Sequence, residues 1–206
     1  MPKPTFFNLS TEKQRSLIDA AKKEFSRVPL YEASISNIIK DAGIPRGSFY
    51  QYFDGLEDIF YFLLHEHSQR NFERLISTMK MNNGDIFATI VDWFKGILIM
   101  FEEPENRQYF KNAFLNMNYK VEKAFTQNMY EEKRKSRFFE IITNINPGNL
   151  NVTNEEEIYH IFKMMMAVSF QNLIHAFAKE LQINDVMKTF LLEIELLKKG
   201  FYKEPK

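Results

Sequence analysis

The sequence predicts an all-α protein, with an N-terminal three-helix domain followed by a larger helical domain and about nine helices in total. Apolar residues recur at spacings of three and four along most of the 206 residues, which is the period of one helix face. Beyond Phe53 no segment shows the apolar and polar alternation of a half-buried strand. Breaks that contain Asn, Gly and Pro separate the periodic segments. We expect the two domains to span residues 1–54 and 55–206.

The segment from Ser34 to Phe53, SISNIIKDAGIPRGSFYQYF, is typical of two short helices joined by a tight turn. Ser34 suits the N-cap of the first helix, because its hydroxyl can accept a hydrogen bond from one of the first free amides. Gly43 suits the turn, since glycine adopts positive φ without steric cost. Pro45 suits the entry to the second helix, where an amide donor would have been unpaired anyway. The segment is therefore predicted to be a helix-turn-helix.

The second helix of this motif carries side chains that suit contact with duplex DNA. Phe49 and Phe53 are four residues apart and can anchor the helix on the core, which leaves a polar surface facing outward. Arg can bind guanine or phosphate, Gln can pair with adenine, and Ser and Tyr hydroxyls can bond phosphate oxygens. A glycine within the helix permits close approach to the DNA backbone. The predicted base contacts are Arg46, Ser48 and Gln51, the predicted phosphate contacts are Ser34, Ser36, Tyr50 and Tyr52, and the same surface includes Pro45 and Gly47.

The run AGIPRGSFYQYF, preceded by SISNII and followed by an acidic helix start, resembles the DNA-binding domain of the TetR family of bacterial transcriptional regulators. The resemblance covers roughly the first 60 to 70 residues, where Leu17, Ile18, Ala21 and Phe25 fill the apolar pattern of that family's first helix. The shorter run PRGSFYQYF is similar to a subgroup, some of whose members sense haem. The resemblance implies a homodimeric repressor that binds a palindromic operator on double-stranded DNA and is released by a small hydrophobic or planar effector.

Two positions depart from the family pattern. Pro29 stands where members often have a glycine that closes the first helix, and proline cannot adopt positive φ. The first helix must therefore end by another route. Leu56 stands where members often have a lysine that contacts phosphate, and a leucine side chain cannot make that contact.

Composition agrees with a DNA-binding protein of the cytoplasm, although it would not identify one alone. The net charge is zero, but residues 1–53 contain eight Lys or Arg against five Asp or Glu, which leaves a modest local positive charge. The start MPKPTFFNLS lacks the pattern of a signal peptide, and no segment approaches twenty uninterrupted apolar residues. We therefore expect a cytoplasmic protein with no membrane partner.

Enzyme signatures are missing from the sequence, which contains no G-x-S-x-G, no glycine-rich phosphate loop, no H-E-x-x-H and no cysteine. We expect no catalytic residue, no metal site and no required cofactor. The alternative that stays open is a helical module that binds a protein partner, haem or a lipid but does not bind DNA. A damaged recognition helix would favour that alternative, and residues 46–52 are intact.

Five periodic segments make up the larger domain. Asn82 to Gly84 and Asn144 to Thr153 form the two clearest breaks. Asp54 with Glu57, and Thr153 with Glu156, are spaced as capping boxes. The predicted helices lie at about 56–80, 85–101, 104–143 with an interruption near Tyr119, 154–181 and 184–201.

Aromatic and methionine side chains are frequent in the middle of the chain and could line a cavity for a planar or lipid-like effector. Ordinary core packing is the simpler interpretation of any single one of them. Haem and fatty-acyl effectors both stay open, and haem ligation would fall to His67 or His175. The candidate pocket residues are His67, Trp93, Phe94, Phe101, Phe110, Phe114, Phe125 and Met165.

The last two helices are the candidates for dimerisation. The helix at 154–181 is apolar on two faces, so it needs two partners, and one of these can be a second subunit. The alternative is a helix that is buried within a monomer. The candidate interface residues are Met164, Val168, Gln171 and His175, with Phe190, Ile194 and Leu197 of the final helix.

Overall fold

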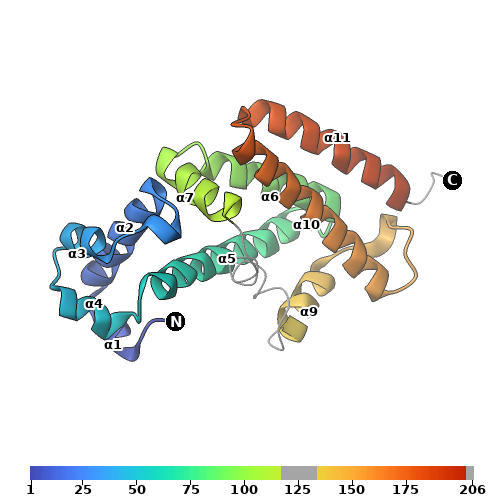
Figure 1. Cartoon of the computed structure of the whole chain (residues 1–206). Helices are drawn as coiled ribbons and strands as arrows, with labels where there is room; N and C mark the ends of the chain where they lie inside the picture. Colours follow the sequence, from blue (N-terminus) through green and yellow to red (C-terminus); the bar gives the residue numbers. More distant parts are fainter. Residues whose placement is uncertain (117–133, 203–206) are drawn as a thin grey trace. The chain divides into compact units, whose positions relative to one another are not determined.

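The computed structural model describes residues 1–116 and 134–202 (Figure 1). These residues contain ten α-helices and two 3₁₀ turns, and outside the helices they pair as β-structure at one isolated bridge, between Leu150 and Tyr202. The predicted all-α fold is confirmed. Helix α1 (Pro4–Phe7) has no counterpart in the sequence prediction. Part of the predicted helical stretch at 104–143, including Phe125, lies outside the described residues.

Contacts divide the chain into two compact units. The first contains Met1–Gln69 together with helix α7, and the second contains Arg70–Met100 together with the described residues from α9 onward. The domain boundary expected at residue 54 stays a prediction, since the first unit also takes in the start of α5 and the whole of α7.

The first unit packs short helices around a closely packed apolar core. Ser10 accepts a hydrogen bond from the Lys13 amide (3.4 Å) and so caps α2, while the Glu103 carboxylate caps α7, which begins at Pro104 as predicted. Phe25 of α2 lies against Phe60 of α5, with ring centroids 5.0 Å apart. The helices of this unit are α1, α2 (Thr11–Arg27), α3 (Ile35–Ala42), α4 (Arg46–Tyr52), the first part of α5 (Leu56–Met81) and α7 (Pro104–Leu115), with a 3₁₀ turn at Leu30–Glu32.

Helix α2 ends without a residue of positive φ, as Pro29 requires. The last carbonyl groups of a helix lack partners within it. Here the Asn112 side-chain amide, on α7, donates to the Phe25 and Ser26 carbonyl oxygens at 2.9 and 3.1 Å. The Ser26 hydroxyl contacts the Lys22 and Glu105 carbonyl oxygens at 2.8 and 3.0 Å. Helix α7 therefore supplies the termination that a glycine would otherwise provide.

The second unit contains the remaining long helices and a tight junction between two of its loops. Gly84, with φ of +79°, follows α5, and a Cβ there would lie 2.6 Å from the Asn146 nitrogen and 2.7 Å from the Asn144 oxygen, so only glycine fits. The break predicted at 82–84 is confirmed. The helices of this unit are the end of α5, α6 (Ile86–Met100), α9 (Arg134–Asn144), α10 (Glu155–Ala178) and α11 (Ile183–Phe201), with a 3₁₀ turn at Pro147–Asn149.

The capping of α10 differs from the predicted pair. Asn154, not Thr153, caps α10 by accepting from the Glu157 amide (3.0 Å), and the Glu157 carboxylate accepts from the Thr153 amide and hydroxyl. The box is one residue later than predicted because Asn154 provides a side-chain oxygen at the N-cap. Before α5, the Asp54 amide donates to the Asp58 carboxylate (3.1 Å). The predicted capping pair of Asp54 with Glu57 stays a prediction.

Candidate DNA-binding site

The turn between α3 and α4 has the geometry that the sequence predicts. Gly43 has φ of +66°, its amide donates to the Lys40 carbonyl (3.3 Å), and the Ile44 amide donates to the Ile39 carbonyl (3.0 Å). These two bonds form a Schellman motif, which satisfies carbonyls at the end of α3. Pro45 is extended and immediately precedes α4. The two helices are therefore joined by a short, hydrogen-bonded turn.

Helix α4 is anchored by aromatic side chains and presents a polar surface. Phe49 and Phe53 are both 0% exposed. Gly47, Gln51 and the other predicted contact residues of α4 are exposed or half-buried. This division is the one expected of a recognition helix, in which buried residues fix the helix and exposed residues meet DNA.

Arg46 links the two helices at the surface. Its guanidinium donates to the Ser36 hydroxyl (3.4 Å) and lies 6.0 Å from the Tyr50 ring centroid. The structure thus brings together three of the predicted contact residues from α3 and α4. At Gly47, next to Arg46, an added Cβ would meet no atom within 4 Å, so packing inside the protein does not require glycine there.

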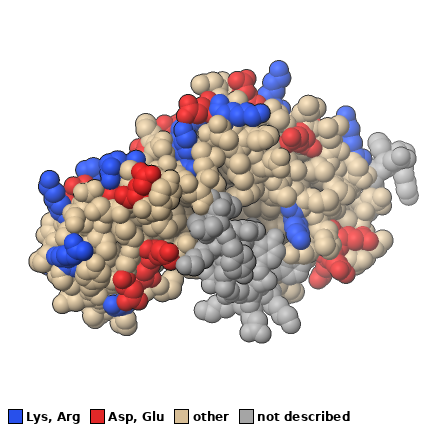
Figure 2. Space-filling model, in the orientation of Figure 1, with Lys and Arg blue, Asp and Glu red and all other residues tan. Residues whose placement is uncertain are grey.

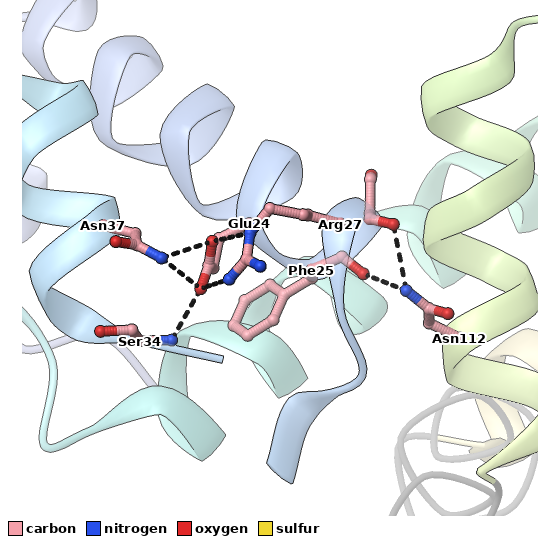
Figure 3. Close-up of polar contacts among 7 residues, drawn as sticks. Glu24, Phe25, Arg27, Ser34, Asn37 and Asn112 are labelled. Carbon is pink, nitrogen blue, oxygen red and sulfur yellow. Dashed lines mark hydrogen bonds and ion pairs between the residues drawn. The ribbon is translucent and has the colours of Figure 1, made fainter. Parts of the chain in front are cut away.

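The capping role predicted for the Ser34 hydroxyl is wrong. Ser34 is the N-cap residue of α3, but its side chain makes no capping hydrogen bond. Instead the Glu24 carboxylate, on α2, accepts from the Ser34 amide (2.8 Å), from the Asn37 side chain (3.1 and 3.2 Å) and from Arg27 (2.8 and 3.0 Å), as Figure 3 shows. An acid ten residues upstream thereby fixes the start of the motif, and no local sequence rule identifies it.

The environment of Glu24 favours its charged form. Burial alone would raise the pKa of this carboxyl group, whose side chain is 4% exposed. The hydrogen bonds from Arg27, the Ser34 amide and Asn37 outweigh burial and lower the pKa below its ordinary value. The buried carboxylate is therefore ionised and fully hydrogen-bonded at neutral pH.

Residues 3–6, here called the N-terminal arm, contact the opposite end of the motif. The Lys3 amide donates to the Tyr52 carbonyl (2.8 Å), the Lys3 ammonium to the Tyr50 carbonyl (2.9 Å), and the Thr5 hydroxyl to the Gln51 carbonyl. No sequence pattern marks these arm residues, since their partners are backbone oxygens 46 to 49 residues away.

Internal ion pairs neutralise part of the positive charge of this region. Lys23 pairs with Asp41 (2.7 Å), and Arg15 lies 3.6 Å from Asp19. On the face shown in Figure 2, acidic and basic side chains are interspersed. The modest positive charge predicted from composition agrees with this arrangement. We therefore expect hydroxyl and backbone amide groups, as well as charge, to contribute to phosphate binding.

Four of the effector candidates lie together in the first unit. The His67 ring is 4.8 Å from Phe110, and Phe110 is 5.2 Å from Phe101 and 5.7 Å from Phe114. The adjacent Tyr109 hydroxyl is buried and, within the described structure, has no hydrogen-bond partner; burial raises the pKa of this group far above its ordinary value. The structure brings these four candidates together, and their role in an effector pocket stays a prediction.

The remaining effector candidates belong to the second unit or lie outside the described residues. Trp93, Phe94 and Met165 are buried in the second unit, where the Trp93 indole donates to the Asn71 carbonyl (3.2 Å). Phe125 is not described. A cavity of about 190 Å³ in the second unit is lined by other, mostly polar residues, including Asp85 and Tyr202. Among the described residues, no group of three His, Asp or Glu side chains could hold a metal ion.

The candidate dimer residues divide into exposed and buried groups. Met164, Gln171 and His175 are exposed on α10, and Val168 is half-buried. On α11, Leu197 is half-buried, but Phe190 and Ile194 are 0% and 1% exposed. Phe190 stacks on Phe94 of its own subunit, with centroids 3.8 Å apart. The assignment of Phe190 and Ile194 to an intersubunit surface is therefore wrong, since the periodicity that selected them marks the subunit core.

Leu192 and Leu196, four residues apart on α11, are 63% and 59% exposed. They were not selected from the sequence. They belong to the face of α11 that points away from Phe190, and they are the better candidates for contact with a partner.

An anchored seven-residue helix with an outward polar face, preceded by a hydrogen-bonded glycine turn, defines a helix-turn-helix protein. Residues 17–61 match the profile of bacterial regulatory proteins of the tetR family, and residues 85–201 match the tetracyclin repressor-like C-terminal domain. The chain belongs to the tetR family of bacterial regulatory proteins. This family consists of regulators, not enzymes.

Individual relatives are more distant. The uncharacterized HTH-type transcriptional regulator YdgC of Bacillus subtilis (strain 168) is 36% identical over 73 residues, which are 35% of this chain and 37% of that protein. SmeT, the repressor of the Stenotrophomonas maltophilia multidrug efflux pump SmeDEF, has a similar structure, with a TM-score of 0.71, 14% identity and coverage of 95% of this chain and 92% of that one. FadR from Bacillus subtilis, solved in complex with stearoyl-CoA, is also similar in structure, with a TM-score of 0.65 and 16% identity. The match covers 90% of this chain and 98% of that one. At such identities the two structures show a shared fold.

Proposed function

We propose that the protein is a dimeric, effector-responsive repressor in the cytoplasm, whose α4 enters the major groove at each half of a palindromic operator. The observation that carries this proposal is that Phe49 of α4 and Phe53, directly after it, are buried, whereas the polar face of α4 is exposed. Arg46, Ser48 and Gln51 are the proposed base contacts. Two-fold symmetry would place the half-sites about 34 Å apart, one turn of the duplex.

A dimer through α10 and α11 is supported by their exposed apolar side chains. Met164, Leu192 and Leu196 are all more than a third exposed. By length and composition alone α10 could cross a membrane, but 44% of its apolar window is buried within the protein. The rest of that apolar surface suits a second subunit, and dimerisation would add the avidity that a weakly charged DNA-binding domain needs.

The effector is proposed to be hydrophobic with a hydrogen-bond acceptor. The aromatic cluster around Phe110 supplies apolar contact, and the buried Tyr109 hydroxyl supplies a donor that the described protein leaves unused. An effector that favours an arrangement of the dimer in which its two DNA-binding domains do not fit the operator would lower the population bound to DNA. Two compounds are suitable first probes: stearoyl-CoA, which one structural relative binds, and haem, which some members of the subgroup with a similar PRGSFYQYF run sense.

The proposal is tested first by selecting bound sequences from random duplex DNA, followed by titration of the selected duplex at several salt concentrations. We expect one palindrome to be enriched and its affinity to fall with rising salt. If a folded dimer enriches no sequence, DNA reading is contradicted and the protein-interaction alternative gains support. Replacement of Gln51 by Ala should change the preferred base, whereas an equal loss on every operator variant would refute its base-reading role.

The effector proposal is tested by release of the selected duplex on addition of stearoyl-CoA or haem. Tyr109→Phe should leave the protein folded, because it removes only a hydroxyl that has no hydrogen-bond partner among the described residues. It should raise the concentration of the active probe needed for release. Release of DNA by the same concentration from the wild type and from Tyr109→Phe would contradict the role of that hydroxyl. For haem, unchanged absorbance after replacing both His67 and His175 by Ala would exclude them as ligands.

A further inference from the structure

We propose that the N-terminal arm, residues 3–6, is a positioning element of the DNA-binding site, which keeps α4 in its binding conformation without contacting bases itself. The inference rests on DNA binding by α4. It assigns a function to residues that precede the helix-turn-helix and that the family's motif does not include.

Helix α4 needs such support because it is short and lacks a side-chain cap. It spans seven residues, and its N-cap, Pro45, makes no capping hydrogen bond. Isolated helices below about 12 to 15 residues are marginal in water. The final carbonyl groups of any helix also lack partners within it. The conformation of α4 therefore depends on contacts from other parts of the chain.

The arm satisfies the last three carbonyls of α4 in sequence. Lys3 donates to the Tyr50 carbonyl through its ammonium (2.9 Å) and to the Tyr52 carbonyl through its backbone amide (2.8 Å). The Thr5 hydroxyl donates to the Gln51 carbonyl. The Lys3 ammonium also places a positive charge at the negative end of the helix dipole. All three bonded residues carry predicted DNA contacts, so the arm contacts the backbone of the residues that meet DNA.

The arm is itself held in place by packing and by an ion pair. Phe6 is 2% exposed, and its ring lies 5.1 Å from Phe53 and 5.7 Å from Phe62. The Lys3 ammonium lies 2.7 Å from the Asp54 carboxylate, which lowers the pKa of that carboxyl group. Figure 1 shows α1 beside α4. The arm and α4 thus share the same aromatic anchor, Phe53.

Loss of an arm contact should reduce the fraction of the protein in which α4 is formed. Apparent affinity falls in proportion to that fraction. The arm bonds to carbonyl oxygens and not to side chains, so its loss should weaken binding to every operator variant equally. A base contact would instead change the preferred sequence.

The test compares three variants of the full-length protein: Thr5→Val, which removes the hydroxyl, Thr5→Ser, which retains it, and Thr11→Val as a control. Thr11 is an exposed residue of α2 for which the described structure shows no side-chain hydrogen bond. The probe is the duplex selected by the wild-type protein. Affinity is measured on it and on its single-base variants, and hydrogen exchange is measured at the amides of residues 50–53.

For Thr5→Val we expect faster exchange in α4 and a loss of affinity of about three- to tenfold, equal on all duplexes. Thr5→Ser and Thr11→Val should match the wild type. Wild-type exchange and affinity in Thr5→Val would overturn the proposal. Faster exchange with unchanged affinity would also overturn it, because the arm would then serve stability alone. If the wild type selects no duplex, the failure lies with DNA binding and not with the arm.

A second variant, Lys3→Met, separates positioning from direct phosphate contact. Its affinity should fall with an unchanged salt dependence. A salt slope reduced by about one unit would instead show that Lys3 binds phosphate, and would contradict its assignment as a positioning residue.

Discussion

At the scale of single residues, Gly47 is where contact with DNA can be tested with the least disturbance of the fold. A Cβ at this position meets no protein atom within 4 Å, and leucine is favoured over glycine in helices by more than about 0.5 kcal/mol. We expect Gly47→Leu to fold normally and to lose operator affinity by about tenfold or more, because its side chain would enter the space taken by DNA. The measurement pairs thermal unfolding with operator titration.

Gly200→Leu is the matched control for Gly47→Leu. Gly200 also has no atom within 4 Å of an added Cβ, but it lies in α11, outside the DNA-binding motif. Because it follows Leu196 by four residues on α11, sedimentation equilibrium first checks that both variants keep the wild-type oligomeric state. Both variants should unfold at or above the wild-type temperature. Equal operator affinity in the two variants would show that Gly47 does not face DNA.

Glu24 is the residue through which stability should depend on acid pH. Its folded-state pKa lies below the ordinary value, so ionised Glu24 stabilises the folded protein above that value, and the stabilisation is lost as the pH falls. We expect Glu24→Gln to lower the free energy of unfolding at pH 7 by about 1–3 kcal/mol. The difference from the wild type should shrink between about pH 5 and pH 3.

Denaturant titrations at several pH values measure the effect of Glu24→Gln, with Glu12→Gln as the control. Glu12 is an exposed acid of the same helix, and its replacement should leave stability nearly unchanged at every pH. A difference between wild type and Glu24→Gln that stays constant from pH 7 to pH 3 would contradict the carboxylate's assigned role.

At the scale of the elements, α2 and α7 are joined by a contact that can be removed with one substitution. Asn112→Ala would leave the Phe25 and Ser26 carbonyls without their amide donor. An unsatisfied buried polar group costs about 1–3 kcal/mol, so a loss of that size is expected in chemical unfolding. Asn8→Ala, at an exposed asparagine of the same unit, is the control. Equal stability of the two variants would mean that α7 does not terminate α2.

The elements that the sequence predicted correctly are those specified by local residues. Helix periodicity, the breaks at 82–84 and 144–153, and the Gly43 turn all depend on neighbours within a few positions. The Glu24 contact to Ser34 and the Asn112 contact to Ser26 of α2 were not predicted, and they join residues 10 and 86 positions apart. Such pairings arise from the packing of whole helices, and the same donor and acceptor types occur at many positions.

At the scale of the whole molecule, α11 has two apolar faces, of which one is buried in its own subunit and the other is exposed. Phe190 and Ile194 face the core of their own subunit, whereas Leu192 and Leu196 are exposed. Periodicity identifies an apolar face but cannot tell which partner covers it, which is why the sequence prediction selected the buried pair. Phe190→Ala should therefore destabilise the subunit by about 3–5 kcal/mol, as expected for a cavity in a packed core.

The exposed pair gives the last prediction, on assembly. Leu192→Glu would place a charge in the proposed contact between subunits, so we expect a folded monomer at micromolar concentration. Because a monomer lacks the avidity of two DNA-binding domains, its operator affinity should fall by about a hundredfold or more. Ile99→Glu, at a 54% exposed apolar residue of α6 in the same unit, should remain dimeric. Sedimentation equilibrium gives the oligomeric state of both variants. If Leu192→Glu sediments as Ile99→Glu does, the subunits do not meet through this face of α11, and the spacing of two α4 helices along the operator would have to be set by another surface.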